Sequence, residues 1–336
     1  MKKVFYFILL YVTSVGAQVN GETVYNFLNL TGSAKQAALG GNTLTLLEDV
    51  NQPLWNPAAI NSKMDNNLAL NYVNYLADVS LVSASYAHLI NRNLGTMQMG
   101  ITYLNYGNFI GADENGNETG NFKAYDMAFS LGYAYNFPKS DFYLGANLKL
   151  INSVIENYSS FGVGGDLSLL YLHPNKPMVI TLVARNFGYQ VTAYDEDKER
   201  LPFQLALGLS YKLEKVPIKW HFSLENLQQW DISESNPSNS ITNLDGLVIE
   251  EKISFFDNAL RHISLGMEIF TESNFNIRAG YNFKRAKELM LNDKRTFAGF
   301  TAGFGLKFRK LVFNYAFSKY HPASNASTFS LHLKLD

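Results

Sequence analysis

The sequence contains no cysteine among its 336 residues. That absence excludes a disulfide framework, thiol catalysis, a cysteine-ligated metal site and a lipidated cysteine behind a signal peptide. The sequence also has no run of about 18 apolar residues after its N-terminal region, which excludes helical membrane spans. Strands remain as the route by which such a chain crosses a bilayer.

Charge is scarce as well. Asp, Glu, Lys and Arg make up 17% of the chain, against about 25% in soluble domains. The formal net charge is -1, and no cluster of basic residues is interleaved with aromatic ones, so a nucleic-acid partner is not indicated. Phe and Tyr are abundant, at 24 and 20 residues against 3 Trp, and there are 24 Gly. This composition is typical of membrane barrels, where aromatic rings lie at the interfaces and glycines allow strands to bend.

The N-terminus has the pattern of a secretory signal peptide, which we place at residues 1–17. Lys2 and Lys3 form the basic part, residues 4–12 are apolar, and Val15-Gly16-Ala17 is a cleavage site of small residues. The mature chain is therefore expected to leave the cytoplasm and to be integral to a bacterial outer membrane.

Large apolar residues alternate with small or polar ones along most of the chain after residue 66. Between Phe122 and Phe137 every second residue is large and apolar, while the residues between include Asp126, Ser130 and Gly132. A period of two is the pattern of a strand with two different faces. The predicted fold is all-β: a transmembrane antiparallel barrel over residues 67–336, with about fourteen strands, an even number as in bacterial barrels. We predict strands at 67–77, 79–90, 95–106, 122–137, 141–153, 161–172, 178–188, 202–213, 217–227, 261–271, 275–283, 296–308, 311–318 and 326–335.

The connections support this interpretation, because membrane barrels have short periplasmic turns and longer extracellular loops. From the second connection on, tight turns alternate with mostly long segments, which are 106–121, 189–201, 228–260 and 284–295. The first connection, near residues 77–78, is an exception. A soluble β-sandwich also alternates, but the non-apolar faces here are mostly Gly, Ala, Ser, Thr and Asn rather than dense charge, which favours a lumen.

Residues 18–66 lack sustained alternation and contain a helix-like piece at 33–41 and a turn at Asn56-Pro57-Ala58. We expect this segment to plug the barrel. Inward-facing Gly100, Gly132 and Gly145 could make room for the plug or for a strand kink. The strands also place charges of both signs inside, and these are expected to pair with one another or with the plug: Asp126, Lys149, Asp166, Arg185, Lys219, Glu225, Glu268 and Arg278.

The strongest polar cluster comes from two neighbouring strands. It is a candidate lumenal network of Lys219, His221, Glu225, His262, Glu268 and Arg278. Ser223, His262 and Glu225 could be drawn as a hydrolase triad. However, neither a strained nucleophile turn nor a pair of oxyanion donors is visible, so the sequence predicts no catalytic residue. No metal or cofactor is predicted, because His221 and Glu225 are roughly 13 Å apart on a strand.

The longest insertion, residues 228–260, combines Trp230 with an apolar end flanked by acids. Insertions of this length are usually functional. Exposed apolar residues there predict either a surface that docks a partner or a lid over the barrel mouth. The candidate docking residues are Trp230, Asp231, Leu247, Ile249, Phe255 and Phe256. The acidic, glycine-rich segment 111–120 does not fit a calcium-binding loop and is expected to be a solvated surface loop.

Several stretches carry a resemblance to a known family. They are residues 24–30, Ser33-Ala34, 38–42, Asn56-Pro57-Ala58, 71–75, 103–107, 160–162, 185–188, 201–203 and 227–231. Together they resemble the PorQ family, outer-membrane components of the type IX secretion system of Bacteroidota, over essentially the whole mature chain. More distantly, the Leu-Gly-Gly and Asn-Pro-Ala elements look like the FadL group of fourteen-stranded barrels with an N-terminal plug.

The PorQ resemblance implies a barrel without enzymatic activity that holds a PorZ-like surface protein in an attachment complex with PorU and PorV, where cargo is joined to lipopolysaccharide. The chain departs from many outer-membrane barrels in ending at Leu335-Asp336 rather than at an aromatic residue. The FadL likeness implies a different function, transport of hydrophobic molecules, and would require an apolar lumenal pocket with a lateral opening.

Overall fold

The computed structural model describes residues 23–76, 78–91, 94–137, 140–233, 241–242, 248–249, 253–288, 297–321 and 324–335. The signal peptide predicted at residues 1–17 lies outside this part of the chain. Within it, no helix is both long enough and apolar enough to cross a membrane.

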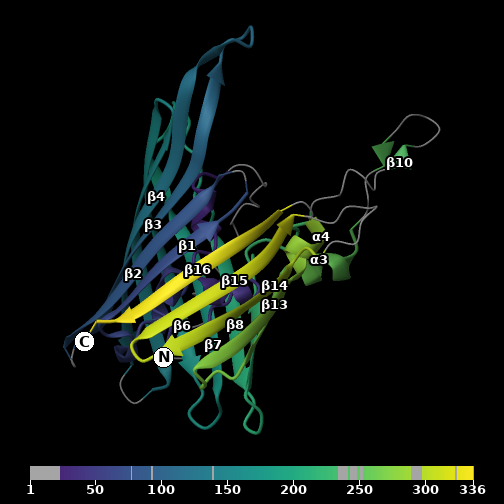
Figure 1. The fold of residues 1–336 in the computed structure, drawn as a ribbon. Coiled ribbons are helices and arrows are strands. Elements are labelled where there is room, and N and C mark those ends of the chain that lie inside the picture. The colour runs from purple at the N-terminus through teal and green to yellow at the C-terminus, as the bar shows by residue number, and fades with distance from the viewer. Residues whose placement is uncertain are drawn as a thin grey trace, which may run out of the picture.

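Fourteen antiparallel strands form a closed barrel, in which β1 pairs with both β2 and β16 (Figure 1). This confirms the predicted fold class. The barrel strands are β1 (Asn67–Asn74), β2 (Ser80–Asn91), β3 (Gly95–Ala112), β4 (Glu118–Asn136), β5 (Phe142–Ile155), β6 (Tyr158–Leu172), β7 (Met178–Thr192), β8 (Gln204–Lys212), β9 (Ile218–Leu224), β12 (Ile263–Ile269), β13 (Phe275–Asn282), β14 (Phe300–Phe308), β15 (Leu311–His321) and β16 (Ser324–Lys334).

The two faces of the wall differ as the alternation predicts. Phe129 and Leu148 point outward and are 41% and 52% exposed, whereas Asp126 and Ser130 point inward and are buried. An outward band of large apolar side chains is suited to lipid, and the closed ring leaves no unpaired strand edge within it.

The two ends of the barrel also differ. At one end, which we call the short-turn end, every connection is brief, for example between Phe308 and Leu311. At the other, the long-loop end, β7 and β8, β9 and β12, and β13 and β14 are joined by long segments. Short turns are periplasmic and long loops extracellular in such barrels. Three connections at the long-loop end are nevertheless short: β1 to β2, β5 to β6 and β15 to β16. In the first of them, Tyr75 N donates to Val79 O (3.0 Å) in a tight turn.

One predicted loop is instead a hairpin. Residues 106–121 were expected to be a loop, but β3 continues to Ala112 and β4 starts at Glu118. β2 pairs with β3 only as far as Asn105, and β5 pairs with β4 only from Ala124. Residues 106–122 therefore form a two-stranded ribbon, here called the β3–β4 ribbon, that rises above the rest of the wall (Figure 1).

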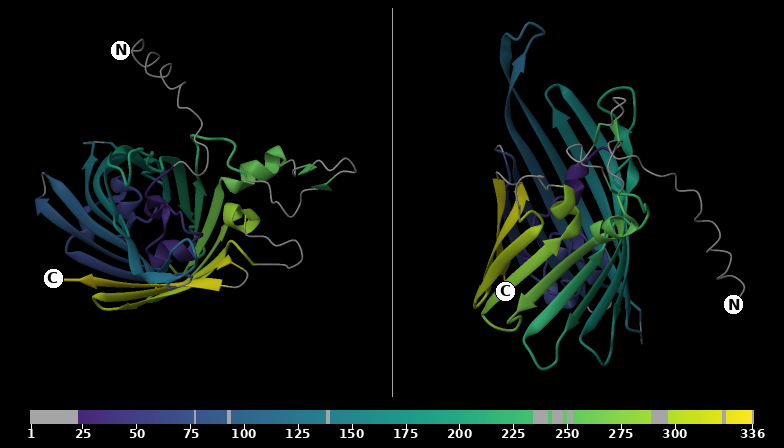
Figure 2. Two further views of the ribbon diagram at one scale, coloured as in Figure 1. Left: turned by 90° about the horizontal axis from the view of Figure 1, so that it is seen from above. Right: turned by 90° about the vertical axis from the view of Figure 1, so that its right-hand side faces the viewer.

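Residues 23–66, here called the inner segment, lie inside the barrel (Figure 2, left). They form short helices: η1 (Asn26–Asn29), α2 (Ala34–Ala38), η2 (Gln52–Leu54), η3 (Pro57–Ala59) and η4 (Ser62–Met64). The described part begins at the long-loop end, where Thr23 bridges to Arg200. It finishes at the short-turn end, where Asn66 O accepts from Leu335 N (2.9 Å). The segment thus runs through the whole lumen.

Glycines on the inner wall allow the inner segment to approach closely. A Cβ atom on Gly145 would lie 2.1 Å from Ala58 N, and one on Gly280 would lie 2.2 Å from Gly40 N. Real Cβ contacts are never so short. The backbone of the inner segment can therefore approach the wall strands this closely only because these positions lack a side chain. Gly100 is filled in the same way by Leu54. The inward glycines accommodate the inner segment in this conformation.

Two short helices lie in the long segments. α3 (Phe255–Arg261) follows Ser254, whose side chain accepts a hydrogen bond from Asp257 N (3.2 Å) as an N-cap. α4 (Phe283–Glu288) follows β13 directly. A separate two-stranded sheet of β10 (Ile241–Thr242) and β11 (Val248–Ile249) stands away from the wall (Figure 1).

Candidate functional site

The lumen is the first candidate site, and its most highly charged part surrounds Glu268. The carboxylate lies 2.9 Å from His221 Nε2, 3.1 Å from Arg278 Nε and 3.7 Å from Lys35 Nζ. Glu268, His221 and Arg278 are buried, and they come from adjacent strands β12, β9 and β13. Lys35 comes from α2 of the inner segment. We call these four residues the Glu268 cluster.

The remaining polar atoms of the Glu268 cluster bind the inner segment and the wall. His221 Nδ1 lies 2.9 Å from Thr45 Oγ1 of the inner segment, and Arg278 Nη1 donates to Asn314 Oδ1 on β15 at 2.8 Å. Lys219 stands opposite Glu268 in the β9–β12 register. Paired and hydrogen-bonded charges of this kind are the form in which charge is tolerated in a protein interior.

A second buried ion pair lies on β5 and β6. Lys149 Nζ lies 2.8 Å from Asp166 Oδ1 and donates to Asn186 Oδ1 at 2.7 Å. Asn186 has a left-handed backbone, with φ 56°, and the β6–β7 register shifts beside it between Gly165 and Leu167. This bulge turns the Asn186 side chain toward the pair, as bulges in barrels commonly do.

Arg185 is fully buried and faces the inner segment. Its guanidinium carbon lies 3.7 Å from the centre of the Trp55 ring, and Nη2 donates to Leu28 O at 2.9 Å. Nη1 donates to Gln204 Oε1 at 3.0 Å. A planar cation that both stacks and donates holds two parts of the inner segment against β7 and β8.

Near the long-loop end, Asp126 accepts hydrogen bonds from Tyr106 Oη (2.6 Å) and from Ser153. Tyr194, in the segment after β7, donates to Ser153. Burial raises the pKa of the Tyr194 phenol to about 12, so it remains a protonated donor. Tyr25 of the inner segment is hydrogen-bonded to Ser160 at the same end.

The structure divides the predicted lumenal network into two parts. His221, Glu268 and Arg278 come together as described. Glu225 instead accepts from Ser264 Oγ (2.7 Å) and from Asn42 of the inner segment. Five partners of the network, all polar, come from outside the predicted set: Lys35, Asn42, Thr45, Ser264 and Asn314.

Ser223, His262 and Glu225 do not form a hydrolase triad. His262 Nδ1 lies 2.6 Å from Glu225 O and Nε2 lies 2.9 Å from Trp230 O. Both partners are carbonyl oxygens, which only accept, so the imidazole is used for structure and does not face the serine hydroxyl as a base would. Among the described residues there is also no group of three His, Asp or Glu placed to hold a metal ion.

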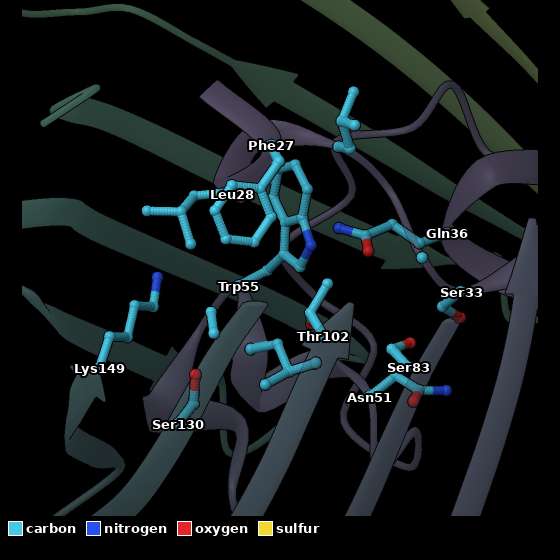
Figure 3. Close-up of a pocket in the computed structure, with 14 residues that line it drawn as sticks. Phe27, Leu28, Ser33, Gln36, Asn51, Trp55, Ser83, Thr102, Ser130 and Lys149 are labelled. Carbon is cyan, nitrogen blue, oxygen red and sulfur yellow. The ribbon is translucent and has the colours of Figure 1, made fainter. Parts of the chain in front are cut away.

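The inner segment leaves little room in the lumen. A cavity of about 40 Å³ lies between it and the wall, lined among others by Phe27, Trp55 and Lys149 (Figure 3). A dry cavity that binds benzene has a volume of about 150 Å³. A second cavity of about 320 Å³ at the long-loop end is lined mainly by polar residues, including Glu225 and Arg285. The first is too small for a hydrocarbon and the second is too polar to favour one. A third cavity, of about 270 Å³ at the short-turn end, has a mostly apolar lining that includes Ile60, Tyr143 and Leu170.

The predicted docking residues fall in different surroundings. Trp230, Phe255 and Phe256 are 52%, 66% and 78% exposed. The ring centres of Trp230 and Phe255 are 4.8 Å apart, so they form one cluster. Asp231 is exposed beside it. Ile249 lies in β11, and Leu247 lies outside the described residues.

Comparison with known protein families finds no match, and comparison of the sequence with curated proteins finds none. The fold is similar to that of solved barrels. The toluene transporter TbuX of Ralstonia pickettii is 12% identical, with 92% of this chain and 98% of that chain covered, at a TM-score of 0.51. The Acinetobacter baumannii outer membrane protein Omp33 is 7% identical, with 80% and 98% covered, at a TM-score of 0.37. At this identity the likeness to TbuX shows the fold alone, and that fold is an outer-membrane β-barrel.

Proposed function

We propose that this chain is a non-enzymatic outer-membrane barrel, closed by its inner segment, that anchors a surface protein. The partner that the PorQ resemblance implies is a PorZ-like protein, and through it PorU and PorV, in a type IX secretion attachment complex at the lipopolysaccharide surface. The role rests on a barrel that is rigid and filled, with its extracellular end free for binding.

The observation that carries the proposal is the inner segment itself. It spans the lumen from Thr23 to Asn66 and is attached to the wall by the Glu268 cluster, by Arg185 and by hydrogen bonds such as Asn147 Nδ2 to Pro53 O (2.6 Å). Each attachment is buried, so breaking it would expose or strand polar groups. A lumen filled in this way supports a scaffold rather than an open channel.

The long-loop end offers surfaces for a partner. The β3–β4 ribbon stands free of its neighbours, and Phe109 and Phe122 stack on it with ring centres 5.1 Å apart. Ile110 beside them is 65% exposed. An isolated two-stranded ribbon is only marginally stable in water, and its outer edges are unpaired, so a partner strand could add to either edge.

The alternative function is transport of hydrophobic molecules, the class to which the toluene substrate of TbuX belongs. In the conformation described here the cavity beside Trp55 is too small for such a substrate. A hydrophobic substrate could pass this point only if the inner segment moved away from the wall.

The two functions are distinguished by what co-purifies with the full chain. We would tag the C-terminus, solubilise the outer membrane in mild detergent and identify bound proteins and lipids by mass spectrometry. Recovery of a surface protein with other secretion components is the expected result. Recovery of the barrel alone with a bound fatty acid or hydrocarbon would instead support transport.

A variant of the β3–β4 ribbon sharpens the experiment. Residues 109–122 are replaced by Asn-Gly, which closes a tight hairpin, and the control replaces only the tip, residues 113–117, in the same way. The barrel of both variants should fold, as judged by its altered mobility in unheated gel samples. We expect the first variant to lose the partner and the control to retain it. Equal recovery from both would exclude the ribbon as the binding surface.

A further inference from the structure

One sector of the barrel wall is short. The adjacent strands β9, β12 and β13 have 7, 7 and 8 residues, whereas β3 and β4 have 18 and 19. A strand needs about 9–11 residues to cross a bilayer at the usual tilt. Seven residues at a rise of about 3.3 Å, tilted by about 40°, cover about 18 Å of the roughly 25 Å apolar band. Strands alone leave this sector several ångströms short.

The exposed aromatic cluster lies at the long-loop end of this short sector. The cluster consists of Trp230, Phe255 and Phe256 and is here called the aromatic shelf. Trp230 follows β9, and the two Phe residues lie in α3, which precedes β12. The Phe255 and Phe256 rings are 5.8 Å apart and meet edge to face, so the shelf is continuous. At the start of the neighbouring strand β14, Phe297 is 79% exposed.

The shelf is held in a fixed position. Trp230 O accepts hydrogen bonds from Asn258 Nδ2 and lies 2.9 Å from His262 Nε2, and the Trp230 ring stacks on His262 with centres 5.4 Å apart. His262 is buried and is itself bound to Glu225 O. The exposed rings are therefore attached rigidly to the wall.

The aromatic shelf lies on the outside of the barrel, away from the lumen. Seen from above, α3 lies outside the ring of strands (Figure 2, left). In Figure 1 α3 lies at the level where β13 ends and β14 begins, far below the tip of the β3–β4 ribbon. Apolar rings at this height continue the outward band of the wall, where Tyr281 and Phe300 are 38% and 42% exposed.

We propose that the aromatic shelf is embedded in the outer leaflet, with lipid acyl chains as its occupant, and that it completes the membrane-facing wall above β9, β12 and β13. Amphipathic helices at a membrane interface bury their apolar face about 5–10 Å into the headgroup boundary. Aromatic girdles occupy the same depth in barrels.

Charge at the shelf agrees with this assignment. α4 packs against α3 and carries Lys284, Arg285 and Lys287, with Lys287 Nζ 2.9 Å from Asp257 Oδ1. Lys284 Nζ also lies 3.7 Å from Glu288 Oε1. These two lysine charges are paired with acids, and paired charges are less costly than bare ones beside a lipid-embedded face. The proposal is independent of the anchoring function, because it concerns how the barrel sits in the bilayer whether or not a partner is bound.

The absence of cysteine allows a direct test. Phe256→Cys is labelled with an environment-sensitive dye in the full chain, reconstituted in phosphatidylcholine nanodiscs with and without a spin-labelled acyl chain. Leu148→Cys on the outward face of β5 is the lipid-exposed control, and Asn115→Cys at the tip of the ribbon is the water-exposed control. All three positions are exposed, so the only ring contact that the substitutions remove is the one between Phe256 and Phe255.

We expect the probe at position 256 to emit at short wavelength and to be quenched by the spin-labelled lipid as the probe at 148 is. Emission like that at 115, with quenching by aqueous iodide, would overturn the proposal. Protection from both quenchers would also overturn it, because protein rather than lipid would then cover the shelf.

Trp230 gives a second measurement without a label. The chain has 3 Trp, so Trp55→Phe with Trp220→Phe leaves Trp230 as the only one. Brominated acyl chains should quench its fluorescence in nanodiscs, and iodide should not. Quenching by iodide alone would place Trp230 in water and contradict the proposal.

Discussion

A single carboxylate, Glu268, shows how the lumen tolerates charge. It lies within ion-pair distance of three cationic or imidazole side chains, one of them contributed by the inner segment. Removing two unlike charges together from an interior is often nearly neutral, but removing one leaves its partners uncompensated. Loss of the Glu268 carboxylate alone should therefore destabilise the folded barrel more than loss of an exposed carboxylate does.

We expect Glu268→Gln to destabilise the folded barrel by about 3–5 kcal/mol, because Arg278 and Lys35 lose their buried counter-charge. The free energy of unfolding would be measured by urea titration of the chain folded into lipid vesicles. Glu272→Gln is the matched control: its carboxylate is 82% exposed and is paired with Lys212 in a turn, so the change should cost about 1 kcal/mol or less. Equal losses from the two variants would contradict the structural role of Glu268.

The sequence predicted which charges point inward but only some of their partners. Alternation along one strand assigns a face to each residue, which is why His221, Glu268 and Arg278 could be placed in one cluster. Contacts with Lys35 and Thr45 depend on the path of an irregular segment through the lumen. Hydrophobic periodicity along the sequence does not predict that path. Pairing His262 with main-chain carbonyls was equally invisible, since backbone partners carry no sequence signal.

At the scale of elements, the strands were largely predictable and the exceptions have physical causes. Residues 106–121 consist mostly of Gly, Asn and acids, which favour turns and disfavour strands. They form the β3–β4 ribbon because the pairing of β3 with β4 continues outward beyond a register shift between Asn105 and Asn108. α3 and α4 were missed because each is shorter than two full turns of a periodic pattern.

The glycines of the wall lead to a prediction about the inner segment. Gly145→Leu places side-chain atoms where Ala58 N now lies 2.1 Å from the ideal Cβ position. Such overpacking costs about 1–3 kcal/mol or displaces the neighbouring chain. We expect the variant to show ion conductance in planar bilayers where the parent is closed, together with a lower melting temperature.

The adjacent residue provides the control for that experiment. Ala146 lies on the outward face of the same strand, so Ala146→Leu adds the same bulk toward lipid and should leave both conductance and melting temperature as in the parent. If the Gly145→Leu variant remained closed and equally stable, the close contact between Ala58 and β5 would be contradicted.

The contact between α3 and α4 predicts a pH response. The hydrogen bond from Lys287 lowers the pKa of Asp257 below its usual value, with Ser254 adding to the effect. Because the folded pKa is depressed, the stabilisation is present above the unfolded pKa of about 3.9, and it is lost as the pH falls through the folded value.

Carboxyl NMR of the labelled chain would measure this titration. We expect Lys287→Met to return the pKa of Asp257 toward its usual value. Lys284→Met is the control, because Lys284 Nζ lies 3.7 Å from Glu288 instead, and it should change the pKa of Asp257 little. A normal pKa in the parent chain would show that the α3–α4 ion pair does not form in solution.

At the scale of the whole molecule, the direction of the inner segment has a consequence for topology. Its described start, at Thr23, is bridged to Arg200 at the long-loop end, and its last residue, Asn66, is bonded to Leu335 at the short-turn end. Since short turns are periplasmic, the chain passes down the lumen from the outer face before it turns into β1. Barrel closure through β1 and β16 then seals it in place.

This path predicts which residues can be labelled from outside the cell. Asn26 and Lys63 are both exposed residues of the inner segment, near opposite ends of the lumen. In the cysteine-free chain, Asn26→Cys should react on intact cells with a maleimide on a polymer too large to cross the outer membrane. Lys63→Cys should react only after the membrane is opened. The opposite pattern would reverse the barrel in the membrane, and reaction of neither residue in intact cells would mean that a partner or another part of the chain covers the outer mouth.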